Sequence, residues 1–123
     1  MGTELHLEVA EEGSDPARLE ELSLRLRQEL LDLDVESVRP YATGDAPEGT
    51  RGDLTMIAGA LAVTLQPTVA LLTAMVGVVR DWAGRGRHAV RVEIGGDVLE
   101  LTAATDEVQR RLVDDWIARH AVT

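Results

Sequence analysis

The sequence predicts one α/β domain of the two-layer α+β type, in which a four-stranded sheet packs against helices. Three observations lead to this prediction: an alternating N-terminal segment, leucines at helical spacing after Pro16, and a hairpin signal at Gly95 and Gly96. A chain of 123 residues, 45% of them hydrophobic, can bury one core, whereas two separate domains would each be too small to be stable. We therefore expect residues 1–123 to form a single domain.

The N-terminal third is expected to fold as strand, helix and strand. The segment ELHLEVA (4–10) alternates polar and apolar side chains, which is typical of a half-buried strand. Asp15 followed by Pro16 is a good helix start. The apolar stripe of this helix consists of Leu19, Leu22, Leu26, Leu30 and Leu33. The segment VESVRPYA (35–42) then predicts a second strand, with Pro40 at its end or on a sheet edge.

The C-terminal third is expected to be a hairpin followed by a helix. The segments HAVRVEI (88–94) and VLELTA (98–103) flank a tight glycine turn, so they predict two antiparallel strands. Thr105 is the expected cap of the last helix. The apolar stripe of that helix consists of Val108, Leu112, Val113, Trp116 and Ile117.

Between these units, the chain runs from Leu54 to Val79 without a charged side chain. A membrane span needs about 20 apolar residues, so length alone permits one. However, Gln66 and Pro67 fall at its centre, and a span would leave two strands on each side of the bilayer with too little core to hold them. Because proline disfavours an unbroken helix, we expect two apolar helices, from Leu54 to Leu65 and from Thr68 to Ala83. The predicted order is β-α-β-α-α-β-β-α.

These two helices are apolar nearly all round, whereas a helix resting on a sheet buries only one side. The other side is either covered within the monomer or left for a second protein. The candidate interface residues are Leu71, Leu72, Met75, Val76, Val79 and Trp82. Small residues spaced by four, among them Ala70 and Ala74, would let a neighbouring helix approach closely.

The composition excludes several kinds of chemistry. The chain has no cysteine and no lysine, which rules out thiol catalysis, disulfides and Schiff-base formation. The histidines His6, His88 and His120 have no second ligand at metal spacing, so neither a metal site nor a cofactor is predicted. Asp114 and Asp115 are adjacent on a helix, where their side chains diverge, so they are not a catalytic pair. We therefore predict no catalytic residues and no enzyme.

The charge distribution argues against nucleic acid as a partner. The net charge is −10, and residues 1–36 hold eleven acids against three arginines. The only Phe, Trp or Tyr side chains are Tyr41, Trp82 and Trp116, too few for a base-stacking platform. The N-terminus has no signal-peptide pattern, so a cytoplasmic location is expected.

Five segments in order carry a family resemblance: APEGTRGD, GALAVTL, LTAMVGVVRDW, VRVEIGGDVLELTAA and RLVDDWIARHA. As a set they resemble the effector-associated constant component family, small single-domain proteins common in actinobacteria and proposed to act in NTPase-dependent bacterial conflict systems. The junction between the apolar segments is often glycine-rich in that family, whereas this chain has Gln66 and Pro67. The family offers no catalytic residues to transfer.

The resemblance implies a non-enzymatic accessory or adaptor module, acting by self-association or by docking an effector such as a caspase-like or trypsin-like peptidase. Two alternatives stay open. One is a membrane-inserting protein that uses the uncharged segment, and the other is a small ligand-binding domain with a polar-lined pocket.

Overall fold

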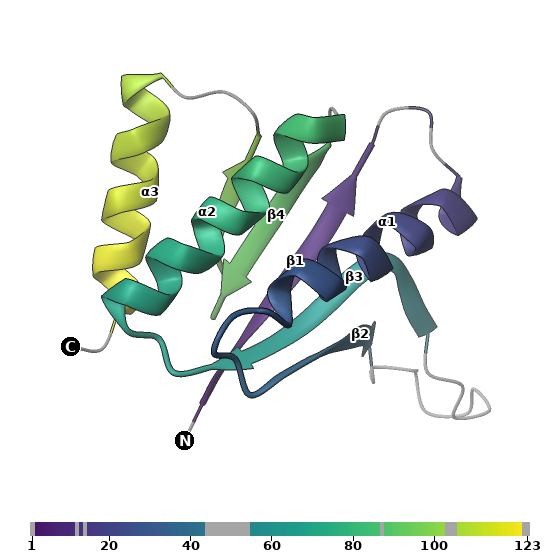
Figure 1. The fold of residues 1–123 in the computed structure, drawn as a ribbon, viewed down its shortest axis with the longest axis horizontal. Helices are drawn as coiled ribbons and strands as arrows, with labels where there is room; N and C mark the ends of the chain where they lie inside the picture. The colour runs from purple at the N-terminus through teal and green to yellow at the C-terminus, as the bar shows by residue number, and fades with distance from the viewer. Residues whose placement is uncertain are drawn as a thin grey trace.

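The computed structural model describes residues 2–11, 13, 15–43, 55–86, 88–102 and 106–121. Within them lie β1 (Thr3–Ala10), α1 (Pro16–Leu30), β2 (Ser37–Thr43), β3 (Thr55–Leu65), α2 (Val69–Gly86), β4 (Ala89–Ile94), β5 (Asp97–Leu101) and α3 (Glu107–His120). The strands form one antiparallel sheet in the order β2-β3-β1-β4-β5. The helices described all lie on the same face of this sheet (Figure 1). The predicted α/β class is therefore confirmed.

The predicted number and order of elements are wrong, because Thr55–Leu65 is a strand and not the first of two apolar helices. β3 lies inside the sheet, between β2 and β1. Its side chains Leu61, Val63 and Leu65 are almost fully buried, and so are Ala60 and Ala62, which alternate with them. A strand that is buried on both sides loses the polar alternation that identifies strands in a sequence. The sheet therefore has five strands. The described elements follow one another along the chain in the order β-α-β-β-α-β-β-α.

The break predicted at Gln66 and Pro67 does mark the end of an element. β3 ends at Leu65 and α2 begins at Val69, so the intervening residues join a strand to a helix and not a helix to a helix. The hydroxyl of Thr68 accepts a hydrogen bond from the Leu71 amide at 3.1 Å, which satisfies one free donor at the start of α2.

Each helix faces the sheet with a stripe of buried side chains, which together with one side of the sheet form the core. These residues are Leu22, Leu26 and Leu30 of α1, Leu72, Met75, Val76, Val79, Trp82 and Ala83 of α2, and Val113, Trp116 and Ile117 of α3. Asp15 caps α1 as predicted, accepting from the Arg18 amide at 2.8 Å. The cap of α3 is Asp106, which accepts from the Gln109 amide at 2.8 Å, whereas the predicted cap Thr105 lies outside the described residues.

β3 contains an irregularity that bends the sheet beside β2. The register between these strands shifts between Pro40 and Ala42, and Gly59 of β3 has a φ of 82°. A Cβ at Gly59 would lie 3.2 Å from both Leu19 Cβ of α1 and the Val9 carbonyl oxygen of β1. Glycine is required here by the positive φ and by the close approach of α1.

At the other side of the sheet, Gly95 and Gly96 form the predicted hairpin turn, with φ values of 56° and 89°. In the part of the chain that the structure describes, no helix combines the length and the apolar character needed to cross a bilayer.

Candidate functional site on the helix-free face of the sheet

The helix-free face of the sheet is built from the residues of each strand that point away from the helices. The strand register places His6 of β1 between Ala62 of β3 and Glu93 of β4. In the same way, Glu8 lies between Ala60 and Arg91. Small side chains on β3 therefore stand next to longer polar side chains on β1 and β4, and this difference in size leaves a depression.

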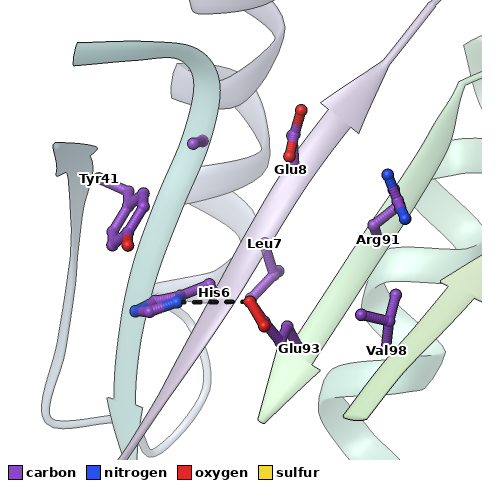
Figure 2. Close-up of a pocket in the computed structure, with 8 residues that line it drawn as sticks. His6, Leu7, Glu8, Tyr41, Arg91, Glu93 and Val98 are labelled. Carbon is purple, nitrogen blue, oxygen red and sulfur yellow. Dashed lines mark ion pairs between the residues drawn. The ribbon is translucent and has the colours of Figure 1, made fainter. Parts of the chain in front are cut away.

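We call this depression the sheet hollow. It has a volume of about 340 Å³ and is lined by His6, Leu7, Glu8, Tyr41, Ala60, Arg91, Glu93 and Val98 (Figure 2). Tyr41 comes from β2, and Val98 comes from β5 at the opposite edge of the sheet. The hollow thus spans the whole width of the sheet.

His6 is held by contacts on several sides. Its ring lies against Tyr41, with centroids 4.1 Å apart and planes inclined by 38°. Its Nε2 is 3.3 Å from Glu4 Oε1, and its Nδ1 is 3.8 Å from Glu93 Oε1. Glu4 also accepts a hydrogen bond from Arg39 at 3.0 Å. These contacts fix one wall of the sheet hollow as a pre-formed surface.

The opposite wall of the hollow contains charges that are not paired with each other. Glu8 and Arg91 are direct neighbours across β1 and β4, and both are exposed. Neither makes an ion pair or a side-chain hydrogen bond within the described residues. Both groups are therefore available to a ligand or to a partner protein.

The polar side chains that line the hollow are a histidine, two carboxylates, a tyrosine and an arginine. No serine, threonine or cysteine is among the lining residues. Over the described ranges, no group of three histidine, cysteine or acidic residues is placed to hold a metal ion. What the arrangement can do is bind, through an aromatic pair, an exposed valine and unpaired charges of both signs.

The predicted interface residues on α2 do not contribute to this face. Five of them are buried beneath the helix: Leu72, Met75 and Val79 are fully buried, Val76 is 3% exposed and Trp82 is 6% exposed. Only Leu71 is partly exposed, and it lies on another surface with Gln66. Pro67 is buried at the junction. Of the six predicted interface residues, only Leu71 is therefore accessible to a partner in the folded chain.

The histidines singled out in the sequence are not brought together. His88 is buried beside Trp82, at a ring distance of 4.7 Å, with its Nδ1 2.8 Å from Glu11 Oε2. That contact is short, but it does not have hydrogen-bond geometry. His120 Nε2 lies 2.6 Å from Asp97 Oδ2 at the end of α3. Only His6 lines the sheet hollow.

The sequence alone missed Tyr41, Glu93 and Val98 as members of this site. The period-two pattern of β1 and β4 already places His6 and Glu93 on polar strand faces, so part of the signal was present. What was absent was the strand order, which decides that these faces are adjacent. No protein-family model matches the chain, and comparisons with curated proteins and with solved structures likewise give no match.

Proposed function

We propose that this protein is a non-enzymatic adaptor module that docks a partner protein on the helix-free face of its sheet. The observation that supports this proposal is the sheet hollow, an open depression on the one sheet face that the described helices leave uncovered (Figures 1 and 2). An uncovered sheet face with a hollow at its centre is a natural seat for a protruding side chain of another protein.

The chemistry of this face indicates what kind of partner it fits. Val98 is 45% exposed and Tyr41 is partly exposed, so they offer apolar and aromatic contact at the two ends of the hollow. Tyrosine and arginine are the residue types that carry most binding energy in protein interfaces. A partner that inserts an apolar or cationic side chain between Tyr41 and Val98 would bury both and approach the Glu8 carboxylate.

The charge of the face supports a partner with basic residues. The described side chains on this face include the carboxylates of Glu4, Glu8, Glu93 and Glu100 and the guanidinium groups of Arg39 and Arg91. Acids therefore outnumber arginines by four to two. The family resemblance suggests the class of partner, an effector such as a peptidase encoded in the same conflict system.

The test is direct binding between the purified protein and candidate effectors encoded beside it, measured by calorimetry. Val98→Arg places a long cation at the end of the hollow, and we expect it to weaken binding at least tenfold. Leu24→Arg is the matched control, because Leu24 is 48% exposed on α1, on the other side of the molecule, and should leave binding unchanged. Equal binding by the wild type and the Val98 variant, or no binding by any candidate effector, would overturn the proposal.

A second candidate function rests on the polar lining of the same hollow. A guanidinium and a carboxylate one strand apart could hold the two charged ends of a small zwitterion such as an amino acid. The volume of about 340 Å³ lies at the lower end of the range of ligand sites. Titration of the labelled protein with single amino acids, followed by NMR, separates the candidates. Shifts at Arg91 and Glu8 that saturate, and that Arg91→Gln abolishes, would favour the ligand-binding function.

A further inference from the structure

We propose that the chain also self-associates head to tail, with the exposed apolar stripe of α3 in one copy seated in an acid-rimmed groove at the start of α2 in the next copy. This contact uses surfaces other than the helix-free face of the sheet. It is therefore independent of the adaptor function proposed above.

The receiving surface, which we call the acidic groove, lies between the α1–β2 connection and the first turns of α2. Its volume is about 640 Å³. Leu33 and Val35 from the connection and Leu71 from α2 form its partly buried apolar floor. Ala70 and Ala74 are exposed one helical turn apart on α2, so a second helix can approach the backbone closely.

One rim of the acidic groove carries like charges. Asp32, Asp34 and Glu36 alternate with the apolar residues of the connection, and all three are exposed. No arginine or histidine is among the residues that line the groove. An occupant that combines apolar side chains with arginines would match both the floor and the rim.

The chain itself presents such a segment on α3. Val108 and Leu112 are 69% and 52% exposed, the highest values among the large hydrophobic side chains described, and they lie one turn apart. They are the α3 outer stripe. Both were predicted to belong to the core stripe of this helix, but the core contacts only Val113, Trp116 and Ile117.

An arginine accompanies the α3 outer stripe. Arg111 follows Val108 by three residues, so it lies beside the stripe on the helix surface, and it is exposed. The ion pair of Arg111 with Glu107 is 3.7 Å long between side chains that are 78% and 84% exposed, so solvent screens it and it is easily exchanged for another partner. The stripe therefore offers apolar groups to the floor of the acidic groove, and Arg111 offers a cation to its rim.

The position of α3 is fixed before any contact forms. Gln109 Nε2 donates to the Glu100 carbonyl at 2.8 Å, and Trp116 Nε1 donates to the Asp97 carbonyl at 3.2 Å. These bonds join α3 to β5 at both ends of the strand and leave Val108 and Leu112 pointing outward. A stripe held in this way loses little conformational entropy when it binds.

A copy cannot fill its own groove. α2 begins beside the C-terminal end of α3, whereas the outer stripe lies in the N-terminal half of α3 (Figure 1). The contact must therefore form between copies. Because it joins two different surfaces, it is heterologous and builds chains or rings in place of a closed pair.

The experiment is sedimentation velocity of the full chain over a concentration series. We expect the wild type to form species larger than a dimer as concentration rises. Leu112→Asp in the stripe and Ala74→Arg in the groove should each weaken association at least tenfold, because each brings like charges together, and Leu24→Asp should behave as the wild type. All three positions are exposed, so circular dichroism should show native spectra. Val108→Asp replaces Leu112→Asp if that variant does not fold.

Mixing the two impaired variants gives the decisive result. The Leu112 variant retains an intact groove and the Ala74 variant retains an intact stripe, so an equimolar mixture should form a 1:1 complex and grow no further. The mass of each chain is 13.3 kDa, so the complex should sediment as a single species with twice that mass. A wild type that stays monomeric, unchanged association of both variants, or a mixture that forms no 1:1 complex would each overturn the proposal. Val98→Arg should leave self-association intact, because Val98 lies in the sheet hollow and not in the acidic groove. Failure of the self-association proposal can therefore be distinguished from failure of the adaptor proposal.

Discussion

Asp97 and Arg119 form a two-pronged ion pair that joins the β4–β5 turn to the end of α3. Arg119 Nε donates to Asp97 Oδ2 at 2.9 Å, and its Nη2 donates to Oδ1 at 3.3 Å. His120 Nε2 lies 2.6 Å from the same Oδ2, and Trp116 donates its indole N–H to the Asp97 backbone carbonyl. One residue, placed by the turn at Gly95 and Gly96, thus holds three side chains of α3.

This arrangement predicts a dependence of stability on pH. The hydrogen bond from Arg119, followed by that from His120, holds the pKa of Asp97 below its ordinary value of 3.8. A carboxyl group with a lowered folded-state pKa contributes stability above its unfolded pKa, and this contribution disappears as the pH falls through the folded value. We expect Asp97→Asn to lower the melting temperature at pH 7, and we expect this loss to shrink progressively as the pH falls below 3.8, so that it is smaller at pH 3.

Thermal melts at the two pH values check this expectation. Asp114→Asn is the control, because Asp114 is exposed on α3, the helix that Asp97 holds, and makes no ion pair within the described residues. It should show no such difference between pH 7 and pH 3. An equal loss for Asp97→Asn at both pH values would mean that the charge of Asp97 contributes nothing.

A pair of glycines provides the second prediction. Gly59→Ala should reduce the free energy of unfolding by about 1–3 kcal/mol, because φ is positive and the new methyl group meets the Val9 carbonyl. Gly77→Ala, in the middle of α2, should instead stabilise the protein by about 0.5–1 kcal/mol, since no atom lies within 4 Å of the added Cβ. Urea denaturation measures both. If Gly59→Ala left the free energy of unfolding unchanged or raised it, the positive φ and the close contact described at Gly59 would be contradicted.

The cap of α3 gives a third prediction. Asp106→Ala should cost about 0.5–2 kcal/mol, because it leaves the Gln109 amide without its side-chain acceptor. Asp114→Ala, an exposed acid within the same helix, should be neutral or slightly stabilising, since alanine favours helix. Chemical denaturation compares the two variants. A cost that is equal for both would show that Asp106 does not act as the cap.

Sequence patterns predicted the elements that have one solvent-exposed face and one buried face. β1 alternates as expected, with Leu5, Leu7 and Val9 buried between exposed or partly exposed neighbours. α1 follows its leucine spacing from the cap at Asp15, and the hairpin turns at Gly95 and Gly96. In each of these cases, water on one side imposes a period of two or of 3.6 that can be read directly.

The sequence could not reveal β3, because residues 60–63 of this strand are buried on both faces of the sheet. Leu61 and Val63 face the helices, and Ala60 and Ala62 are covered by larger side chains of the neighbouring strands on the other face. A short apolar run without period fits a buried helix equally well. The sheet hollow could not be predicted for the same reason, since Ala60 of β3 lines it and the position of β3 in the sheet was not known from the sequence.

The last prediction tests whether the apolar face of α2 is core or interface. Leu72 is fully buried, so Leu72→Ala removes packed methyl groups and should cost about 2–5 kcal/mol. Leu112→Ala is the same chemical change at a position that is 52% exposed, and in dilute solution it should alter stability by less than about 0.5 kcal/mol.

Urea denaturation at low micromolar concentration compares these two variants without interference from self-association. A mild effect of Leu72→Ala, similar to that of Leu112→Ala, would mean that α2 separates readily from the sheet, and the predicted interface at Met75, Val76 and Val79 would become accessible. A large effect means that a partner could reach those side chains only by unfolding the core. In that case, docking must use the surfaces that the folded chain leaves exposed.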